Sequence, residues 1–168
     1  MKHLIKSFAA FAIIALVGCG GKEEKKEDSS VKIGAKPKTE VKQEAPAKSD
    51  VKPSQMVDLT NKGVGPIKNV ELGETIDQAM AAKGAEVFKM NCTACHKTDK
   101  KFIGPAPKGI LERRTPEWIM NMIMDPEGMV NNDPLAKALL MEFNGSPMAN
   151  QNMTEEQSRQ ILEYFRTL

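Results

Sequence analysis

The chain has 168 residues, of which 40% are hydrophobic and 27% charged, a composition typical of one modest globular domain. Its formal net charge is only +2: residues 20–72 carry 11 basic and 9 acidic side chains, and residues 73–168 carry 11 and 13. Nucleic-acid binding is excluded because no basic stripe is present, and three cysteines are too few for a disulfide framework.

The N-terminus is typical of an export signal. A basic start precedes an apolar run over residues 8–17, which is too short to span a bilayer as a permanent helix. Residues 16–19 (LVGC) resemble the bacterial lipobox. The resemblance implies that residues 1–18 are a lipoprotein signal peptide and that acyl chains on Cys19 hold the protein on a membrane. A conventional signal peptide that contains a cysteine is the alternative.

A flexible, charged linker is predicted for residues 19–72, after the lipidated cysteine. Its first part is rich in Lys, Glu, Ser, Pro and Ala, and this composition cannot bury enough apolar surface to offset the entropy of the chain. As a disordered tether it would span on the order of 40 Å. Residues 54–72 are more apolar, and an irregular arm wrapped around the following domain is an open alternative for them.

An all-α domain is predicted for residues 73–168, since no segment alternates like a strand. Capping boxes at Thr75 and Thr154 indicate the first and last helices, and an initial proline indicates the two between. Asp125-Pro126 is predicted to end the second helix and Asn144-Gly145 the third. The expected helices cover residues 75–91, 116–125, 134–143 and 154–167. The loops that remain are unusually long for a small domain, unless something else organises them.

Residues 92–96 (CTACH) form the Cys-x-x-Cys-His motif of c-type haem attachment. Cys92 and Cys95 would add across the haem vinyl groups from one helical turn, and His96 would then reach the iron. A zinc site needs further ligands, but the one other histidine is His3. A thioredoxin-like pair needs a βαβ setting, which is not visible. The motif therefore predicts one covalent haem c. A buried haem is a large apolar body and would compensate for the low aromatic content of the chain, which is only 5%.

Residues 73–168 resemble a class I cytochrome c domain. The resemblance rests on a pattern that begins with Gly84 and Phe88 and ends in the haem motif. It implies a small helical fold around the haem, in which Gly84 lets the first helix cross closely against the last. Tyr164 or Phe165 matches the aromatic residue that packs at this crossing.

The same resemblance implies the surroundings of the iron. Gly104-Pro105 matches a Gly-Pro pair whose carbonyl accepts a hydrogen bond from the ligating histidine, which orients the ring and makes it more basic. Pro105 as a plain loop breaker is the alternative. The implied sixth ligand is Met148, in the loop before the last helix, with Met153 as its rival. Ala149 follows Met148, where the family often has proline.

Several other side chains have open interpretations. Trp118 is expected in the core, with a place beside the haem as the alternative. Arg113 and Arg114 either pair with a haem propionate, because arginine suits carboxylate geometry, or form a solvated surface pair. Methionines at helical spacing are more often core residues than ligands. The methionines interpreted in this way are Met120, Met122, Met124, Met129 and Met141.

Iron bound by both His96 and Met148 has no open position for substrate, so electron transfer rather than catalysis is expected. His/Met ligation raises the reduction potential, which favours a carrier that feeds a terminal acceptor. We expect a monomer, lipid-anchored on the periplasmic side, that takes electrons from a quinol-oxidising complex and passes them to a terminal oxidase or reductase. The alternatives are a haem enzyme or sensor with a labile or absent sixth ligand, and a subunit of a larger respiratory complex.

Overall fold

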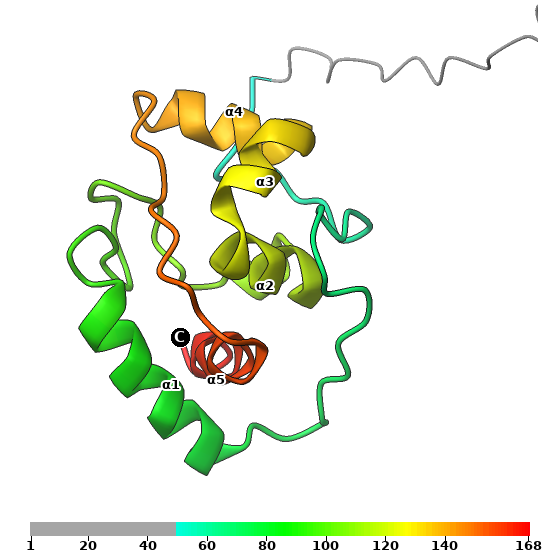
Figure 1. Ribbon diagram of the computed structural model, residues 1–168, viewed down its shortest axis with the longest axis vertical. Helices are drawn as coiled ribbons and strands as arrows, with labels where there is room; N and C mark the ends of the chain where they lie inside the picture. The colour runs from blue at the N-terminus through cyan, green and yellow to red at the C-terminus, as the bar shows by residue number, and fades with distance from the viewer. Residues whose placement is uncertain (1–49) are drawn as a thin grey trace, which may run out of the picture. The chain divides into compact units, whose positions relative to one another are not determined.

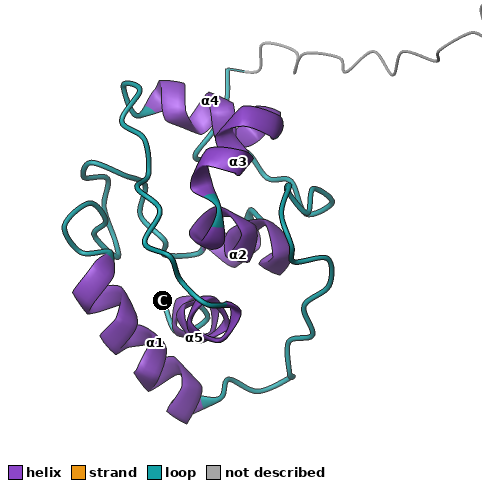
Figure 2. Ribbon diagram, viewed as in Figure 1, coloured by secondary structure: helices purple, strands orange, loops and turns teal. Residues whose placement is uncertain are grey.

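The computed structural model describes residues 50–168, so the expected signal peptide and Cys19 lie outside the described residues. In the described part, the regular secondary structure consists of helices, apart from one isolated bridge between Asp58 and Arg114. This confirms the predicted all-α fold class (Figure 2). Its helices are α1 (Gln78–Asn91), the 3₁₀ helix η1 (Ile110–Glu112), α2 (Pro116–Met124), α3 (Pro126–Asn132), α4 (Pro134–Glu142) and α5 (Glu155–Phe165). Among residues 50–168, no helix has both the length and the apolar character needed to cross a membrane.

Three successive helices begin with a capping side chain followed by proline. Thr115, Asp125 and Asp133 each accept a hydrogen bond of 2.7–3.1 Å from the backbone N–H three residues later. Proline suits the next position because an N–H there would have no partner within the helix. Asp125-Pro126 ends α2 as predicted, but it also opens α3, where a connection between two helices was expected.

The ends of the other helices agree with the prediction except at one cap. Thr154 forms the predicted capping box at the start of α5. Asn144 and Gly145 end α4, both in the left-handed region at φ 58° and 70°. The cap of α1, however, is Asp77 rather than Thr75: its side chain accepts a hydrogen bond of 2.9 Å from Met80 N–H. The cap therefore lies two residues later than predicted, at Asp77, whose backbone N–H also donates to Glu163 of α5.

The first and last helices cross at Gly84, side by side in the fold (Figure 1). A Cβ atom on Gly84 would lie 1.9 Å from the Gln160 carbonyl oxygen, so only glycine permits this approach. The Phe88 ring packs against Tyr164 and Phe165 alike, with ring centroids 5.6 Å apart in both pairs. Both candidate aromatics thus pack at the crossing.

A second contact between these helices is a buried carboxylate. Glu163 has no exposed surface and accepts hydrogen bonds from Arg159 (2.5 Å), Arg166 (2.7 Å) and the Asp77 N–H (2.8 Å). Burial alone would raise the pKa of Glu163. The hydrogen bonds from Arg159 and Asp77, together with the charges of Arg159 and Arg166, instead hold that pKa below its ordinary value of 4.5. The ionised carboxylate thus fastens α5 to the start of α1.

Replacement of Glu163 by glutamine should destabilise the protein by about 2 kcal/mol or more at neutral pH, because it leaves two arginines without their buried counter-ion. A lowered folded-state pKa means that the stabilisation is present above the ordinary pKa and is lost as the pH falls through the folded value. Thermal unfolding at several pH values should therefore show less acid sensitivity in Glu163→Gln. The exposed Glu156→Gln should change stability by under about 0.5 kcal/mol, and an equal loss in both variants would contradict this account.

Residues 50–72, which we call the arm, pack on the helical domain (Figure 1). Ile67 is 5% exposed and lies in the core, where its N–H and carbonyl group both bond to the Asn121 amide at 3.0 and 2.9 Å. Asn61 bonds through its carbonyl oxygen to Thr115 and through its amide to Asp133, both at 2.7 Å. Residues 54–72 thus pack as the irregular arm that was the alternative to a flexible linker, because buried side chains of α2 and its N-cap, Asn121 and Thr115, bond to backbone groups of the arm.

Candidate haem-binding site

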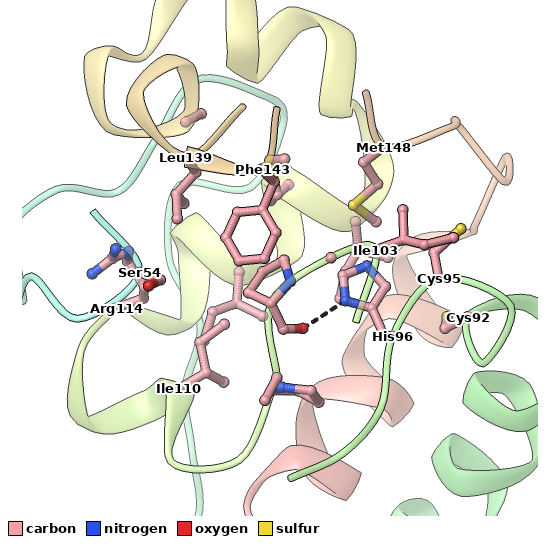
Figure 3. Close-up of a pocket in the computed structure, with 18 of the residues that line it drawn as sticks. Ser54, Cys92, Cys95, His96, Ile103, Ile110, Arg114, Leu139, Phe143 and Met148 are labelled. Carbon is pink, nitrogen blue, oxygen red and sulfur yellow. Dashed lines mark hydrogen bonds between the residues drawn. The ribbon is translucent and has the colours of Figure 1, made fainter. Parts of the chain in front are cut away.

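The residues of the Cys-x-x-Cys-His motif open onto a cavity of about 190 Å³. One water molecule needs roughly 10–15 Å³, so the cavity has room for an organic group of many atoms. Its walls are mainly apolar side chains, including Phe88, Ile119, Ile123, Leu139, Ile161 and Phe165. All five site residues predicted for the domain line it: Cys92, Cys95, His96, Pro105 and Met148 (Figure 3).

The two cysteines stand on one turn of chain at the end of α1. Cys92 is the C-cap, and its carbonyl oxygen accepts hydrogen bonds from the N–H groups of Cys95 (3.1 Å) and His96 (2.8 Å). Both thiols are free of disulfide bonding; Cys92 is half-buried and Cys95 exposed. Burial, and then the neighbouring Cys95, raises the pKa of the Cys92 thiol to about 11. The turn presents both sulfur atoms at the same end of the cavity.

The His96 ring is fixed from two directions. Its Nδ1 lies 2.8 Å from the Pro105 carbonyl oxygen, which can only accept, so Nδ1 carries the proton. Gly104 lies against the ring: a Cβ atom there would come within 2.5 Å of the imidazole Cε1. With Nδ1 engaged, the other ring nitrogen, Nε2, is free to bind a metal.

Met148 differs from the other methionines in its position. It lies in the loop between α4 and α5, and Figure 3 shows its side chain directed toward the His96 imidazole. Met153 instead packs against the hydrophobic core and does not line the cavity. Met122, which was expected in the core, lines the cavity from α2. Met148 therefore lines the same cavity as His96, and Met153 does not.

The far end of the cavity is partly polar. Trp118 is 3% exposed, and its indole N–H donates to Asp133 at 3.2 Å, so it is both a core residue and a cavity wall. Arg113 and Arg114 also line the cavity. Arg114 is 3% exposed, which rules out a solvated surface pair. Ser54 of the arm lines this end as well, and no sequence signal indicated it, because it arrives only when the arm folds back.

These residues fit a covalently attached haem. Two thiols on one turn, an imidazole oriented by a carbonyl group, a thioether and an apolar cavity are the chemistry that c-type attachment and axial ligation require. Within residues 50–168, no group of three or more His, Cys, Asp or Glu side chains is placed to hold a metal ion by itself. The fold and the site thus define a helical c-type haem protein.

Comparison with known proteins agrees with this class. The family described as Cytochrome c matches residues 81–168, more than half of the chain, and the chain belongs to this family. It is similar to the solved structure of a cytochrome c from Rhodothermus marinus, with 47% identity, a TM-score of 0.59 and coverage of 61% of this chain and 88% of that one. A search of curated proteins found no match.

Engineered forms of the Rhodothermus marinus cytochrome c are similar to the same extent. One is 46% identical, with a TM-score of 0.59 and coverage of 61% of this chain and 89% of that one. Another, described as bound to a carbene intermediate, is 46% identical with a TM-score of 0.57 and coverage of 61% and 88%. The chain is thus a monohaem class I c-type cytochrome, a haem-binding electron carrier with one covalent haem c.

Proposed function

We propose that this cytochrome holds its haem iron between His96 and Met148 and carries single electrons to a terminal oxidase or reductase. The observation that carries the proposal is the meeting of both side chains at one apolar cavity, with Met148 directed toward the imidazole (Figure 3). The haem supplies the reversible one-electron couple. His/Met ligation raises its reduction potential, which suits delivery to a terminal acceptor.

The chain's own residues support a carrier in three ways. Pro105 holds the His96 ring and increases its basicity as a ligand. The apolar walls exclude water, which limits solvent rearrangement when the charge changes. Cys95 and Ile103 are exposed beside the motif, so a redox partner can approach the haem at the cysteine end of the cavity. Encounters of this kind bury small areas and are transient.

The proposal includes attachment to the outer side of the cytoplasmic membrane through Cys19, with a quinol-oxidising complex as the donor. Its support is the apolar run over residues 8–17 and the LVGC sequence at 16–19. Cell fractionation tests the anchor: the haem protein should sediment with membranes, and Cys19→Ala should be released from them. A Cys19→Ala protein that stays in the membrane fraction would remove this part of the proposal.

A second candidate function is that of a haem enzyme or sensor with a labile methionine. The favouring observation is that an engineered relative, 46% identical, is described as bound to a carbene intermediate. An iron atom that loses Met148 would have the open position that such chemistry requires.

Carbon monoxide distinguishes the two functions. The reduced wild-type protein, mixed with excess CO, should keep its absorption spectrum over minutes, because Met148 occupies the sixth position. Rapid and complete formation of the CO adduct in the wild type would instead favour the enzyme or sensor. The measurement needs only the purified holoprotein, a reductant and a spectrophotometer.

A further inference from the structure

Hydrogen bonds hold the loop that carries Met148 only at its two ends. Within residues 50–168, the segment 147–152 forms hydrogen bonds only among its own residues. It is followed by the capping box at Thr154 and preceded by Phe143, the C-cap of α4, which is 5% exposed and lines the cavity. The position of Met148 therefore depends on how firmly the end of α4 and the start of α5 are fixed.

The end of α4 has little support from the other helices. α4 has nine residues and packs mainly on α3, which has seven. Its buried residues, Leu135 and Ala136, lie in its first turn, whereas Met141 in its last turn is 70% exposed. Helices this short are marginal unless tertiary contacts hold them. The last turn of α4 therefore needs a contact from outside the helices.

The arm provides this contact at Glu142, the last residue of α4. The N–H and hydroxyl groups of Ser54 donate to the two carboxylate oxygens of Glu142 at 2.7 and 2.6 Å. Hydrogen bonds to an ionised carboxylate are among the short and strong ones. Ser54 is itself fixed, because the carbonyl oxygens of Pro53 and Met56 accept hydrogen bonds from Arg114, which is 3% exposed. The Ser54–Glu142 pair, which we call the clamp, thus joins the end of α4 to the segment just before α2.

We propose that the clamp holds Met148 in place as the sixth ligand, so that Ser54 and Glu142 are positioning residues that act through the loop. Met148 follows Glu142 by six residues, and the loop between them has no other hydrogen bond to the arm. The inference rests on the proposed function, since it concerns the same ligand. A closed clamp favours the electron carrier, because the sixth position stays occupied. A released clamp lets the loop move away and opens the position that the second candidate function needs.

The test is a titration of the ferric full-length holoprotein with imidazole, followed by absorption spectroscopy. Imidazole competes with Met148 for the sixth position, so its apparent affinity rises with the fraction of molecules in which the loop is open. Glu142→Ala removes both acceptors of the clamp and should tighten imidazole binding about fivefold, on the scale of one charge-assisted contact. Ser54→Ala keeps the backbone N–H and removes the hydroxyl group, and it should tighten binding about twofold.

Two further variants show whether the effect passes through the clamp and the loop. Glu155→Ala is the matched control: it removes an exposed glutamate at the start of α5, seven residues after Met148, and should leave the affinity within about 1.5-fold. In a Met148→Leu background no methionine remains to be displaced. Glu142→Ala should therefore change the affinity there by under about 1.5-fold, because the two substitutions act on the same step.

An unchanged affinity in Ser54→Ala and Glu142→Ala, or an equal change in Glu155→Ala, would overturn the proposal. A fivefold effect of Glu142→Ala that persists in the Met148→Leu background would also overturn it, since the clamp would then act on the cavity and not on the ligand. If Glu142→Ala does not accumulate, Ser54→Ala alone decides. Failure of the proposed ligation has a different signature: the wild type and Met148→Leu would bind imidazole equally well.

Discussion

Replacement of Met148 by leucine should remove the long-wavelength charge-transfer band of the ferric protein and lower its reduction potential. Leucine keeps the volume of the side chain but has no sulfur to bind iron. Axial ligands set haem potentials over a range of roughly 0.8 V, and loss of the thioether should lower the potential on the order of 0.1 V. The reduced variant should also bind CO rapidly, because the sixth position is then open.

Two other methionines provide matched controls for this result. Met153 packs against the core beside α5, and Met122 lines the cavity from α2. Met153→Leu and Met122→Leu should both retain the band and a potential close to that of the wild type. A band that persists in Met148→Leu and disappears in Met122→Leu would assign the sixth ligand to α2 instead of the loop.

The motif and most helix ends could be predicted because they depend on neighbours in the sequence. The spacing of Cys92, Cys95 and His96 is compatible with one turn whatever surrounds it, and a capping box such as that at Thr154 is closed within four residues. The start of α1 was misplaced because Thr75 and Asp77 are both good caps. A contact with Glu163, 86 positions away in the sequence, holds the chain at Asp77.

The arm could not be placed from its composition for the same reason. The apolar residues of 54–72 show no helical or strand period, and Ile67 is the one that becomes fully part of the core, where Asn121 of α2 bonds to both of its backbone groups. Ser54 and Arg114 come together through contacts between segments about 60 residues apart. The composition of a segment indicates how much apolar surface it can bury by itself. It does not indicate which hydrogen-bond and packing partners a distant helix provides.

The segment over 126–132 shows how one signal can have two meanings. Asp125-Pro126 correctly predicted the end of α2, since the residue before a proline disfavours the helical conformation. The same aspartate accepts a hydrogen bond from Gly128 N–H at 2.9 Å, and the proline takes the first position of α3. The same two residues therefore end one helix and begin the next. The apolar residues that follow are too few to show a helical period, so the sequence pattern did not indicate α3.

Substitution of Gly84 should destabilise this domain through a backbone clash between two helices. The Cβ atom of alanine would lie 1.9 Å from the carbonyl oxygen of Gln160 and 2.9 Å from the nitrogen of Ile161, and both are backbone atoms that cannot rotate away. The helices would have to separate, which would loosen the packing of Phe88 on α5 and the adjoining wall of the cavity. We expect a loss of about 1–3 kcal/mol in Gly84→Ala, and more in Gly84→Val.

Helix propensity alone predicts that Gly84→Ala stabilises the protein, so the measured change in stability distinguishes propensity from the clash. Alanine in a helix interior is favoured over glycine by about 1 kcal/mol, so a Gly84→Ala variant free of the clash would be more stable than the wild type. Gly73→Ala is the matched control, since its Cβ atom would meet only the Thr75 carbonyl oxygen at 3.5 Å. Thermal unfolding of the holoproteins should therefore place Gly84→Ala below the wild type and Gly73→Ala level with it. A higher melting temperature for Gly84→Ala would mean that the close crossing of α1 and α5 is not what requires glycine at this position.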